Sequence, residues 1–134
     1  MHFAPYIYFY GTCEEALDFY KSVFGGDYQA MRFAGSPMAA QTPPEFADKI
    51  MHATFTAPGI TFMASDGGPG KSIDPDAGNI ALSIGGEDVA AGTRMFNALA
   101  EGGKITMPLE KQFWGATFGQ LIDRFGNQWM FNLG

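Results

Sequence analysis

The chain has 134 residues, of which 46% are hydrophobic and 15% aromatic, so it can bury the core of one domain. Its formal net charge of −6 and its lack of Lys or Arg runs argue against nucleic acid and anionic membranes as partners. No apolar stretch approaches the ~20 residues that span a bilayer. We expect no signal peptide, and the single cysteine suits the reducing cytoplasm, where we expect the protein to be located.

The chain opens with a predicted strand at residues 6–9, in which Tyr6 and Tyr8 point to the same side. Thr12 and Glu15 have the spacing of a capping box, in which the threonine hydroxyl accepts the amide of the glutamate. A helix with one apolar face follows, and the glycine pair after residue 24 ends it.

The rest of the first half alternates predicted strands with long loops. The strands expected are residues 27–33, 50–57 and 60–64. The loop at 34–48 is either a lid or partner-contacting arm, or a passive surface excursion. The loop at 65–79 contains a Gly-Lys-Ser sequence, but it lacks the first glycine of a phosphate-binding P-loop and no helix pattern follows.

The second half repeats the first in a divergent form. Its expected elements are a strand at 80–84, a helix at 87–100 and strands at 104–109, 116–122 and 127–133. The helical run that ends at Gly25-Gly26 is echoed by the run that ends at Gly102-Gly103. Each half therefore reads as strand, helix and three strands, and the seam between two such copies is a natural place for a ligand.

Many short sequences, in order along nearly the whole chain, resemble the PhnB-like proteins of the glyoxalase, or vicinal-oxygen-chelate, superfamily. They are Pro5-Tyr6-Ile7-Tyr8-Phe9, Glu15-Ala16-Leu17-Asp18-Phe19-Tyr20, Phe24-Gly25-Gly26, Ile50-Met51-His52-Ala53, Met63-Ala64-Ser65-Asp66, Gly103-Lys104-Ile105-Thr106-Met107-Pro108-Leu109, Phe113-Trp114, Asp123-Arg124-Phe125-Gly126 and Trp129-Met130. The resemblance implies an α+β fold of two βαβββ modules. These would form a curled, incompletely closed, mixed barrel-like sheet around a cavity, with the helices outside.

The same resemblance implies how the chain is divided and how it associates. We expect one glyoxalase-like domain over 1–134, with a first module at about 1–66, a linker at about 67–78 and a second module at about 79–134. We also expect a homodimer, because members of this family commonly dimerise and a half-open barrel leaves apolar surface to cover.

Superfamily enzymes hold a divalent metal with His and Glu side chains, and alignment places those four positions on Pro5, Met63, Asn79 and Met130. Proline has no side-chain donor, and thioether sulfur is a poor ligand for hard divalent ions. We therefore expect no cofactor and no metal, with a divalent metal as the alternative.

The candidate ligand site combines sulfur-bearing and aromatic side chains of both halves. Its residues are Tyr6, Tyr8, His52, Met63, Asn79, Trp114 and Met130, with Trp129 as a further aromatic wall. We expect them to hold a small hydrophobic or aromatic molecule in the cavity between the modules. Plain core packing is the alternative for the methionines and aromatics.

Whether the chain is an enzyme is left open by the sequence. The alternative is a glyoxalase-superfamily enzyme of the isomerase, lyase or dioxygenase type, which uses either a divalent metal or the imidazole of His52 as acid or base, with Tyr6 or Tyr8 as a further proton-transfer group. A hydrogen-bonded structural histidine is the competing interpretation. Alternation places His52 on one strand face with Ile50, Thr54 and Thr56.

Three other residues carry groups that are reactive in some proteins. Cys13 begins a helix, where the dipole favours a thiolate, but two neighbouring glutamates oppose it. Asp66 and Asp123 follow predicted strands and are expected to be turn-capping carboxylates.

Overall fold

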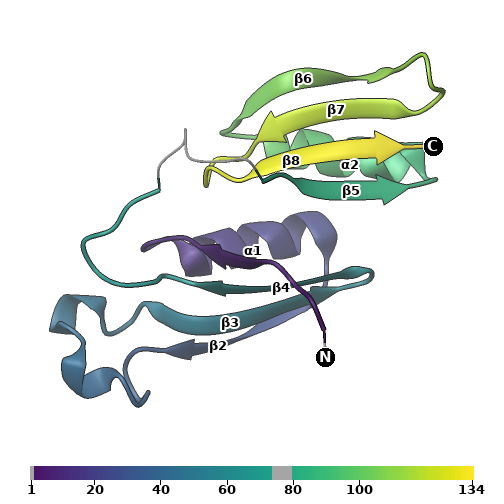
Figure 1. Ribbon diagram of the computed structural model, residues 1–134. Coiled ribbons are helices and arrows are strands. Elements are labelled where there is room, and N and C mark those ends of the chain that lie inside the picture. Colours follow the sequence, from purple (N-terminus) through teal and green to yellow (C-terminus); the bar gives the residue numbers. More distant parts are fainter. Residues whose placement is uncertain (1, 74–79) are drawn as a thin grey trace. The chain divides into compact units, whose positions relative to one another are not determined.

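The computed structural model describes residues 2–73 and 80–134 and divides into two compact units, Met1–Ile73 and Asp74–Gly134. Each unit is described by itself. Both units have the element order strand, helix and three strands (Figure 1), which confirms the duplicated module. Within the described residues, no helix has the length and apolarity to cross a membrane.

The first unit is a four-stranded mixed sheet with one helix. Its elements are β1 (Tyr6–Tyr8), α1 (Cys13–Phe24), β2 (Asp27–Arg32), β3 (Ile50–Ala57) and β4 (Ile60–Ser65). The strand order is β1-β4-β3-β2, with β1 parallel to β4 and the other neighbours antiparallel. The two edge strands, β1 and β2, do not pair, so this sheet is open.

The second unit repeats this topology. Its elements are β5 (Leu82–Gly86), α2 (Val89–Ala100), β6 (Lys104–Lys111), β7 (Thr117–Ile122) and β8 (Gln128–Leu133). The strand order β5-β8-β7-β6, again with the first pair parallel, is the order of the first unit. The α+β class predicted from the sequence is confirmed, and the strands form two open sheets of four.

In each unit the helix covers one face of the sheet. On α1, Tyr20 is fully buried and meets Phe62 of β4 edge to face, with 5.8 Å between ring centroids. On α2, Phe96 makes the same kind of contact with Phe131 of β8 at 5.4 Å. Aromatic pairs in this arrangement add to the free energy of burying the rings. The core of each unit therefore lies between its helix and one face of its sheet.

The repeated glycine pairs have a steric cause in the close approach of each helix end to the sheet. A Cβ atom added to Gly26 would lie 2.2 Å from the carbonyl oxygen of Thr56, and one added to Gly103 would lie 2.2 Å from that of Ile122. Only glycine fits at either position. The second glycine of each pair thus lets the chain pass against a strand backbone.

The start of α1 is held by a carboxylate that is distant in the sequence. Asp66, 1% exposed, accepts the amides of Gly11 and Cys13 at its Oδ1 atom and that of Ile50 at its Oδ2 atom, each at 2.8 Å. The predicted capping box is wrong, because the Thr12 hydroxyl donates to the carbonyl of Phe9 and caps no amide. Asp66 was predicted to cap a turn, and the structure shows that it caps the start of α1 instead, where it satisfies orphan amides.

Asp123 is a buried capping carboxylate of the second unit, and it caps a turn between two strands. Its Oδ1 atom accepts the amides of Phe125 and Asn127 in the turn between β7 and β8, at 2.9 and 3.0 Å. Its Oδ2 atom accepts the indole Nε1–H of Trp129 at 2.9 Å. The turn-capping role predicted for Asp123 is therefore confirmed.

The segment after β2 is a closed loop that contains two short 3-10 turns, Ala39–Gln41 and Pro44–Phe46. Backbone pairing continues into its base, where the Phe33 amide donates to Lys49 and the Ala34 amide donates to Ala47. The ring of Phe33 packs on Phe46, with 5.2 Å between centroids.

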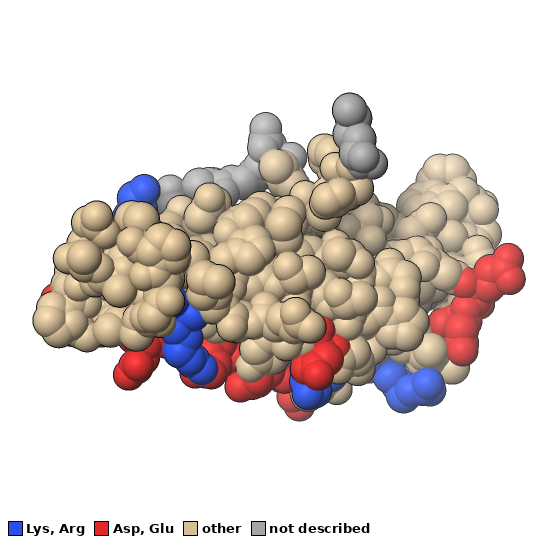
Figure 2. Space-filling model, turned by 90° about the horizontal axis from the view of Figure 1, so that it is seen from below, with Lys and Arg blue, Asp and Glu red and all other residues tan. Residues whose placement is uncertain are grey.

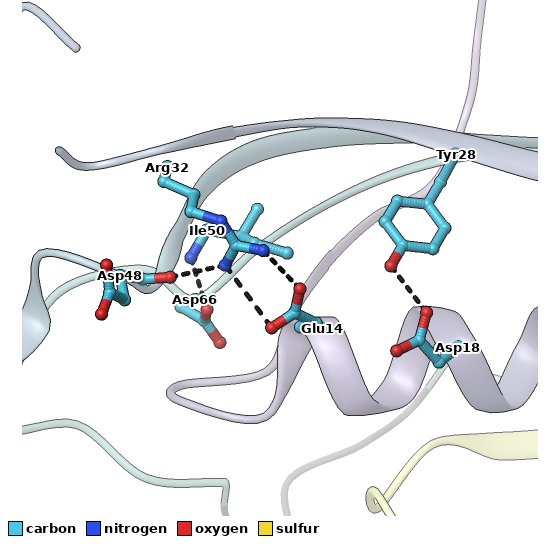
Figure 3. A network of polar contacts seen from close by, with 7 residues as sticks. All are labelled: Glu14, Asp18, Tyr28, Arg32, Asp48, Ile50 and Asp66. Carbon is cyan, nitrogen blue, oxygen red and sulfur yellow. Dashed lines mark hydrogen bonds and ion pairs between the residues drawn. The ribbon is translucent and has the colours of Figure 1, made fainter. Parts of the chain in front are cut away.

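Side chains on α1 and β2 anchor this part of the unit (Figure 3). The Arg32 guanidinium donates to the carboxylate of Glu14 on α1 and to the backbone carbonyl of Asp48. On the same side of the sheet, the Tyr28 hydroxyl donates to Asp18 at 2.6 Å. These contacts fix the helix-facing side of β2.

Candidate functional site

The candidate site is the face of the first sheet that is turned away from α1, called here the open face. In β4, Phe62 and Ala64 are buried toward the helix, so Met63 and the neighbours on its side lie on the open face. Tyr6 of β1 is the register partner of Met63, and Thr54 of β3 is its partner on the other side. Alternation therefore brings side chains of β1, β3 and β4 onto one surface.

The central contact of the open face joins Tyr6 and His52. The Tyr6 hydroxyl lies 3.0 Å from the Nδ1 atom of His52, across the intervening strand β4. In one tautomer of the imidazole the phenol donates to Nδ1, and in the other Nδ1–H donates to the phenol oxygen. The sequence predicted both residues as candidates, and the structure brings them into direct contact.

Three tyrosine rings continue this contact along the N-terminal segment. The centroids of Tyr6 and Tyr8 are 5.2 Å apart, and Tyr8 stacks on Tyr10 at 5.8 Å with nearly parallel planes. Tyr6 is 40% exposed and Tyr8 50% exposed. These two rings are therefore available to a molecule that approaches the open face.

The surroundings of Tyr6 keep its hydroxyl protonated. Partial burial is the largest effect that raises the pKa of Tyr6, and the neighbouring Tyr8 raises it further. A hydrogen bond with the side chain of Ser65 has the opposite, smaller effect. Ser65 is the register partner of Tyr8 and is 4% exposed. Tyr6 can thus act as a neutral hydrogen-bonding group at ordinary pH.

A change of register alters one neighbour predicted for His52. Pairing between β2 and β3 shifts after Met31, so that Met31 is opposite His52 and Arg32 is opposite Ile50. Ile50 is fully buried, and Arg32 reaches Glu14 on α1. The bulge interrupts the alternation, so Ile50 does not share the open face with His52, as the sequence had predicted.

The second unit carries the other candidate residues. Met130 of β8 is paired with Ser83 and Gln120. Trp114 is 52% exposed, and its indole Nε1–H lies 3.4 Å from the side-chain oxygen of Asn132, on the same side of β8 as Met130.

Trp129 does not share that side. It is 4% exposed and bonded to Asp123, so the prediction that it lines a ligand site with Met130 is wrong. Asn79 lies outside the described residues. The predicted cavity between the modules stays a prediction, as does the homodimer.

The donor set at the superfamily's metal positions does not fit a divalent ion. Pro5 takes part through its backbone carbonyl, which accepts the amide of Met63 at 2.9 Å. The side chains of Met63 and Met130 offer only thioether sulfur, which suits soft metals. Among residues 2–73 and 80–134, no cluster of three His, Cys, Asp or Glu residues could hold a metal.

Within the sheet of the first unit, acidic and strongly basic side chains are confined to the edge strand β2, where Asp27 is opposite Thr56 and Arg32 is opposite Ile50. The described strands β1, β3 and β4 carry no Lys, Arg, Asp or Glu. Figure 2 shows most charged side chains along one margin of the face in view and one basic side chain at the opposite margin, and the area between them is uncharged. Cys13 is fully buried, and burial raises the pKa of its thiol, so it has no thiolate character.

Comparison with known proteins gives matches over the whole chain. A family described as 3-demethylubiquinone-9 3-methyltransferase matches residues 1–131. Protein YjdN of Escherichia coli is 33% identical, over 99% of this chain and 95% of its own length. The crystal structure of protein PA1353 from Pseudomonas aeruginosa is 40% identical, with a TM-score of 0.84 over 99% of this chain and 97% of that one.

Two further structures place the fold. The PhnB protein from Bacillus cereus is 27% identical, with a TM-score of 0.77 over the full length of both chains. A glyoxalase/bleomycin resistance protein from Albidiferax ferrireducens, at 15% identity and a TM-score of 0.61 over 98% of each chain, shares the fold alone. The chain therefore belongs to the PhnB-like family described as 3-demethylubiquinone-9 3-methyltransferase, which has the glyoxalase-like fold.

Proposed function

We propose that this protein binds a small aromatic molecule on the open face of its first sheet, without a divalent metal. The observation that carries the proposal is the Tyr6–His52 hydrogen bond beside the half-exposed ring of Tyr8. Together these side chains offer an aromatic surface with two polar atoms at its edge. Recognition sites for small molecules combine a mostly apolar lining with a few placed polar groups.

The chemistry of the face favours a neutral ring that bears oxygen substituents. Tyr8 and Tyr6 offer ring faces for stacking, and Met63 offers a soft, adaptable contact next to Tyr6. The phenol and the imidazole can donate to or accept from a hydroxyl or carbonyl group. Because no Lys, Arg, Asp or Glu lies on β1, β3 or β4, these strands offer no ionic partner to a charged organic ligand. The family description names demethylubiquinone, a molecule with an oxygenated ring, and our proposal uses only this feature of the description.

Ligand-observed NMR would test this proposal with matched probes. Hydroquinone and 2-naphthol present oxygen atoms, whereas naphthalene presents the ring alone. We expect Tyr8→Ala to weaken binding of both naphthyl probes by roughly 10-fold, the equivalent of a lost ring contact. Tyr6→Phe and His52→Gln should weaken 2-naphthol several-fold and leave naphthalene unchanged, because about 1 kcal/mol is lost per hydrogen bond.

Tyr28→Phe is the matched control, since Tyr28 lies on the helix-facing side and bonds to Asp18. Equal effects of Tyr8→Ala and Tyr28→Phe would contradict the proposal, as would probes that bind the wild type and the Tyr8→Ala variant with the same affinity.

A second candidate function is proton transfer to or from the bound ring, with His52 as the acid or base and Tyr6 as its partner. The hydrogen bond between the two side chains supports it, because it orients the imidazole and gives it a partner that can share a proton. Solvent deuterium should then enter a hydroxylated ring probe faster with the protein than without it. His52→Gln should reduce that rate by at least about 100-fold. A rate unchanged by His52→Gln in a folded variant would remove His52 from the reaction.

A further inference from the structure

His52 lies between two methionines on the neighbouring strands. Met31 of β2 is its register partner, and Met63 of β4 is the partner of Thr54, two residues further along β3. All three side chains belong to the open face. Directly opposite residues in a sheet have Cβ atoms about 5 Å apart, and diagonal neighbours are about 7–8 Å apart. Both methionine side chains are long and unbranched enough to bring their sulfur atoms to the imidazole from either side.

The imidazole has one nitrogen in use and one available. Its Nδ1 atom is 3.0 Å from the Tyr6 hydroxyl, and its Nε2 atom has no hydrogen-bond partner within residues 2–73 and 80–134. Histidines that bind metals hold their second nitrogen in a hydrogen bond of this kind, which fixes the tautomer and the ring orientation. With Nδ1–H donating to the phenol oxygen, the lone pair of Nε2 is free to bind a cation.

We propose that Met31, His52 and Met63 form a binding site for a soft monovalent metal ion, Cu(I) or its chemical analogue Ag(I). The two thioethers are soft ligands and the imidazole is a borderline one, all three are neutral, and this set favours Cu(I) over hard divalent ions. No carboxylate of β1, β3 or β4 adds the negative charge and hard oxygen that Mg²⁺ or Ca²⁺ requires. The site is a binding site alone, and no redox step is attached to it.

Nearby cationic side chains are directed elsewhere. Arg32 follows Met31 in the chain, but its guanidinium is paired with Glu14 on the helix-facing side. Lys21 lies on α1 and is paired with Asp27 at 3.2 Å. Neither positive charge therefore lies among the three ligands, where it would repel a metal ion.

The test is a titration of methyl-13C-methionine protein with Ag(I) in chloride-free buffer. We expect the methyl signals of Met31 and Met63 to shift together and to saturate at one equivalent. Met38 and Met107 are also about half exposed but lie outside the site, so their signals should not move at that ratio. Titration with Cu(I), whose free concentration is set by a competing chelator, should shift the methyl signals of the same two methionines.

Variants at the site locate the ligands. Met31→Leu and Met63→Leu conserve side-chain volume and should each weaken Ag(I) binding, whereas Met38→Leu and Met107→Leu should not. His52→Gln should abolish the one-equivalent saturation. Tyr6→Phe should weaken binding by about 10–100-fold, because it removes the partner that orients the imidazole.

A buried thiol is the competing site for a soft metal, and Cys13 is the single cysteine. Cys13→Ala should leave the shifts of Met31 and Met63 unchanged. Shifts that are lost with Cys13→Ala, or that affect all exposed methionines alike, would overturn the proposal. Met31→Leu should leave the binding of 2-naphthol intact, so failure of the metal site and failure of the aromatic site are separable.

Discussion

Replacing the carboxylate of Asp66 by an amide should destabilise the first unit more than any surface charge change. Asp66→Asn keeps the shape of the side chain but exchanges one acceptor oxygen for an NH2 donor. Suppose that the side-chain oxygen of the asparagine still accepts from the backbone N–H groups of Gly11 and Cys13. Its side-chain NH2 group then faces the backbone N–H of Ile50, and that buried donor has no acceptor. An unsatisfied buried donor costs about 1–3 kcal/mol, and the two remaining bonds lose the strength that the charge provided.

Together these effects amount to about 3 kcal/mol of the free energy of unfolding. With a urea slope of roughly 2 kcal/mol/M, the unfolding midpoint should fall by about 1.5 M, as measured by far-UV circular dichroism. Asp48→Asn is the matched control, because the Asp48 side chain is exposed and acts on Arg32 through a minor charge interaction, while its backbone carbonyl accepts the hydrogen bond. Surface changes of that kind alter stability by less than about 0.5 kcal/mol.

Amide hydrogen exchange makes the same test residue by residue. The amides of Gly11, Cys13 and Ile50 should lose protection in Asp66→Asn before other amides of the unit do. Equal urea midpoints for Asp66→Asn and Asp48→Asn, or unchanged protection at all three amides, would refute the reasoning that these bonds hold the start of α1.

Three further outcomes follow from the fold. Gly25→Ala should cost about 1–3 kcal/mol in urea unfolding, because the Gly25 backbone, at φ 74° and ψ −154°, lies in a region that is essentially restricted to glycine. Gly26→Ala, also at a positive φ and with a Cβ 2.2 Å from the carbonyl oxygen of Thr56, should cost at least twice as much. Equal losses of stability in the two variants would show that the protein relieves the contact with Thr56 at little cost in free energy. The hydrogen bond to Asp18 raises the pKa of Tyr28 from 10.0 to about 12, so it contributes stability below pH 10.0 that is lost as the pH rises to about 12. Tyr28→Phe should flatten the stability curve over that window, and an unchanged slope would contradict this. Sedimentation equilibrium should give twice the chain mass of 14.5 kDa for the homodimer expected from the resemblance, and a monomer at micromolar concentration would count against it.

The order of the elements was predictable because it depends on local patterns. Alternating apolar residues and the glycine pairs located the strands and both helix ends. The group that caps α1 was not predictable in the same way, since the acceptor for the start of this helix is Asp66, more than fifty residues away, and not Thr12. A local motif cannot reveal a competing group that only the fold brings near.

The site was predictable as a set of residues and not as a set of contacts. Alternation placed Tyr6 and Tyr8 on one face, but the hydrogen bond from Tyr6 to His52 depends on strand order, which brings β1 beside β4 rather than β2. Ile50 was assigned to the wrong face because a bulge leaves no mark in an alternating sequence. Trp129 was misplaced because its indole bonds to Asp123, a contact that a list of aromatic positions does not contain.

The closed base of the segment between β2 and β3 makes that segment a natural place to graft foreign sequence. Backbone bonds from Phe33 to Lys49 and from Ala34 to Ala47 hold its two ends together independently of what the tip contains. Because closing a longer loop costs little once its ends are fixed, a peptide tag or a reporter inserted near Met38 should be displayed without disturbing the strands below it. The protein would then serve as a carrier that presents its cargo beyond the end of β2 and the start of β3.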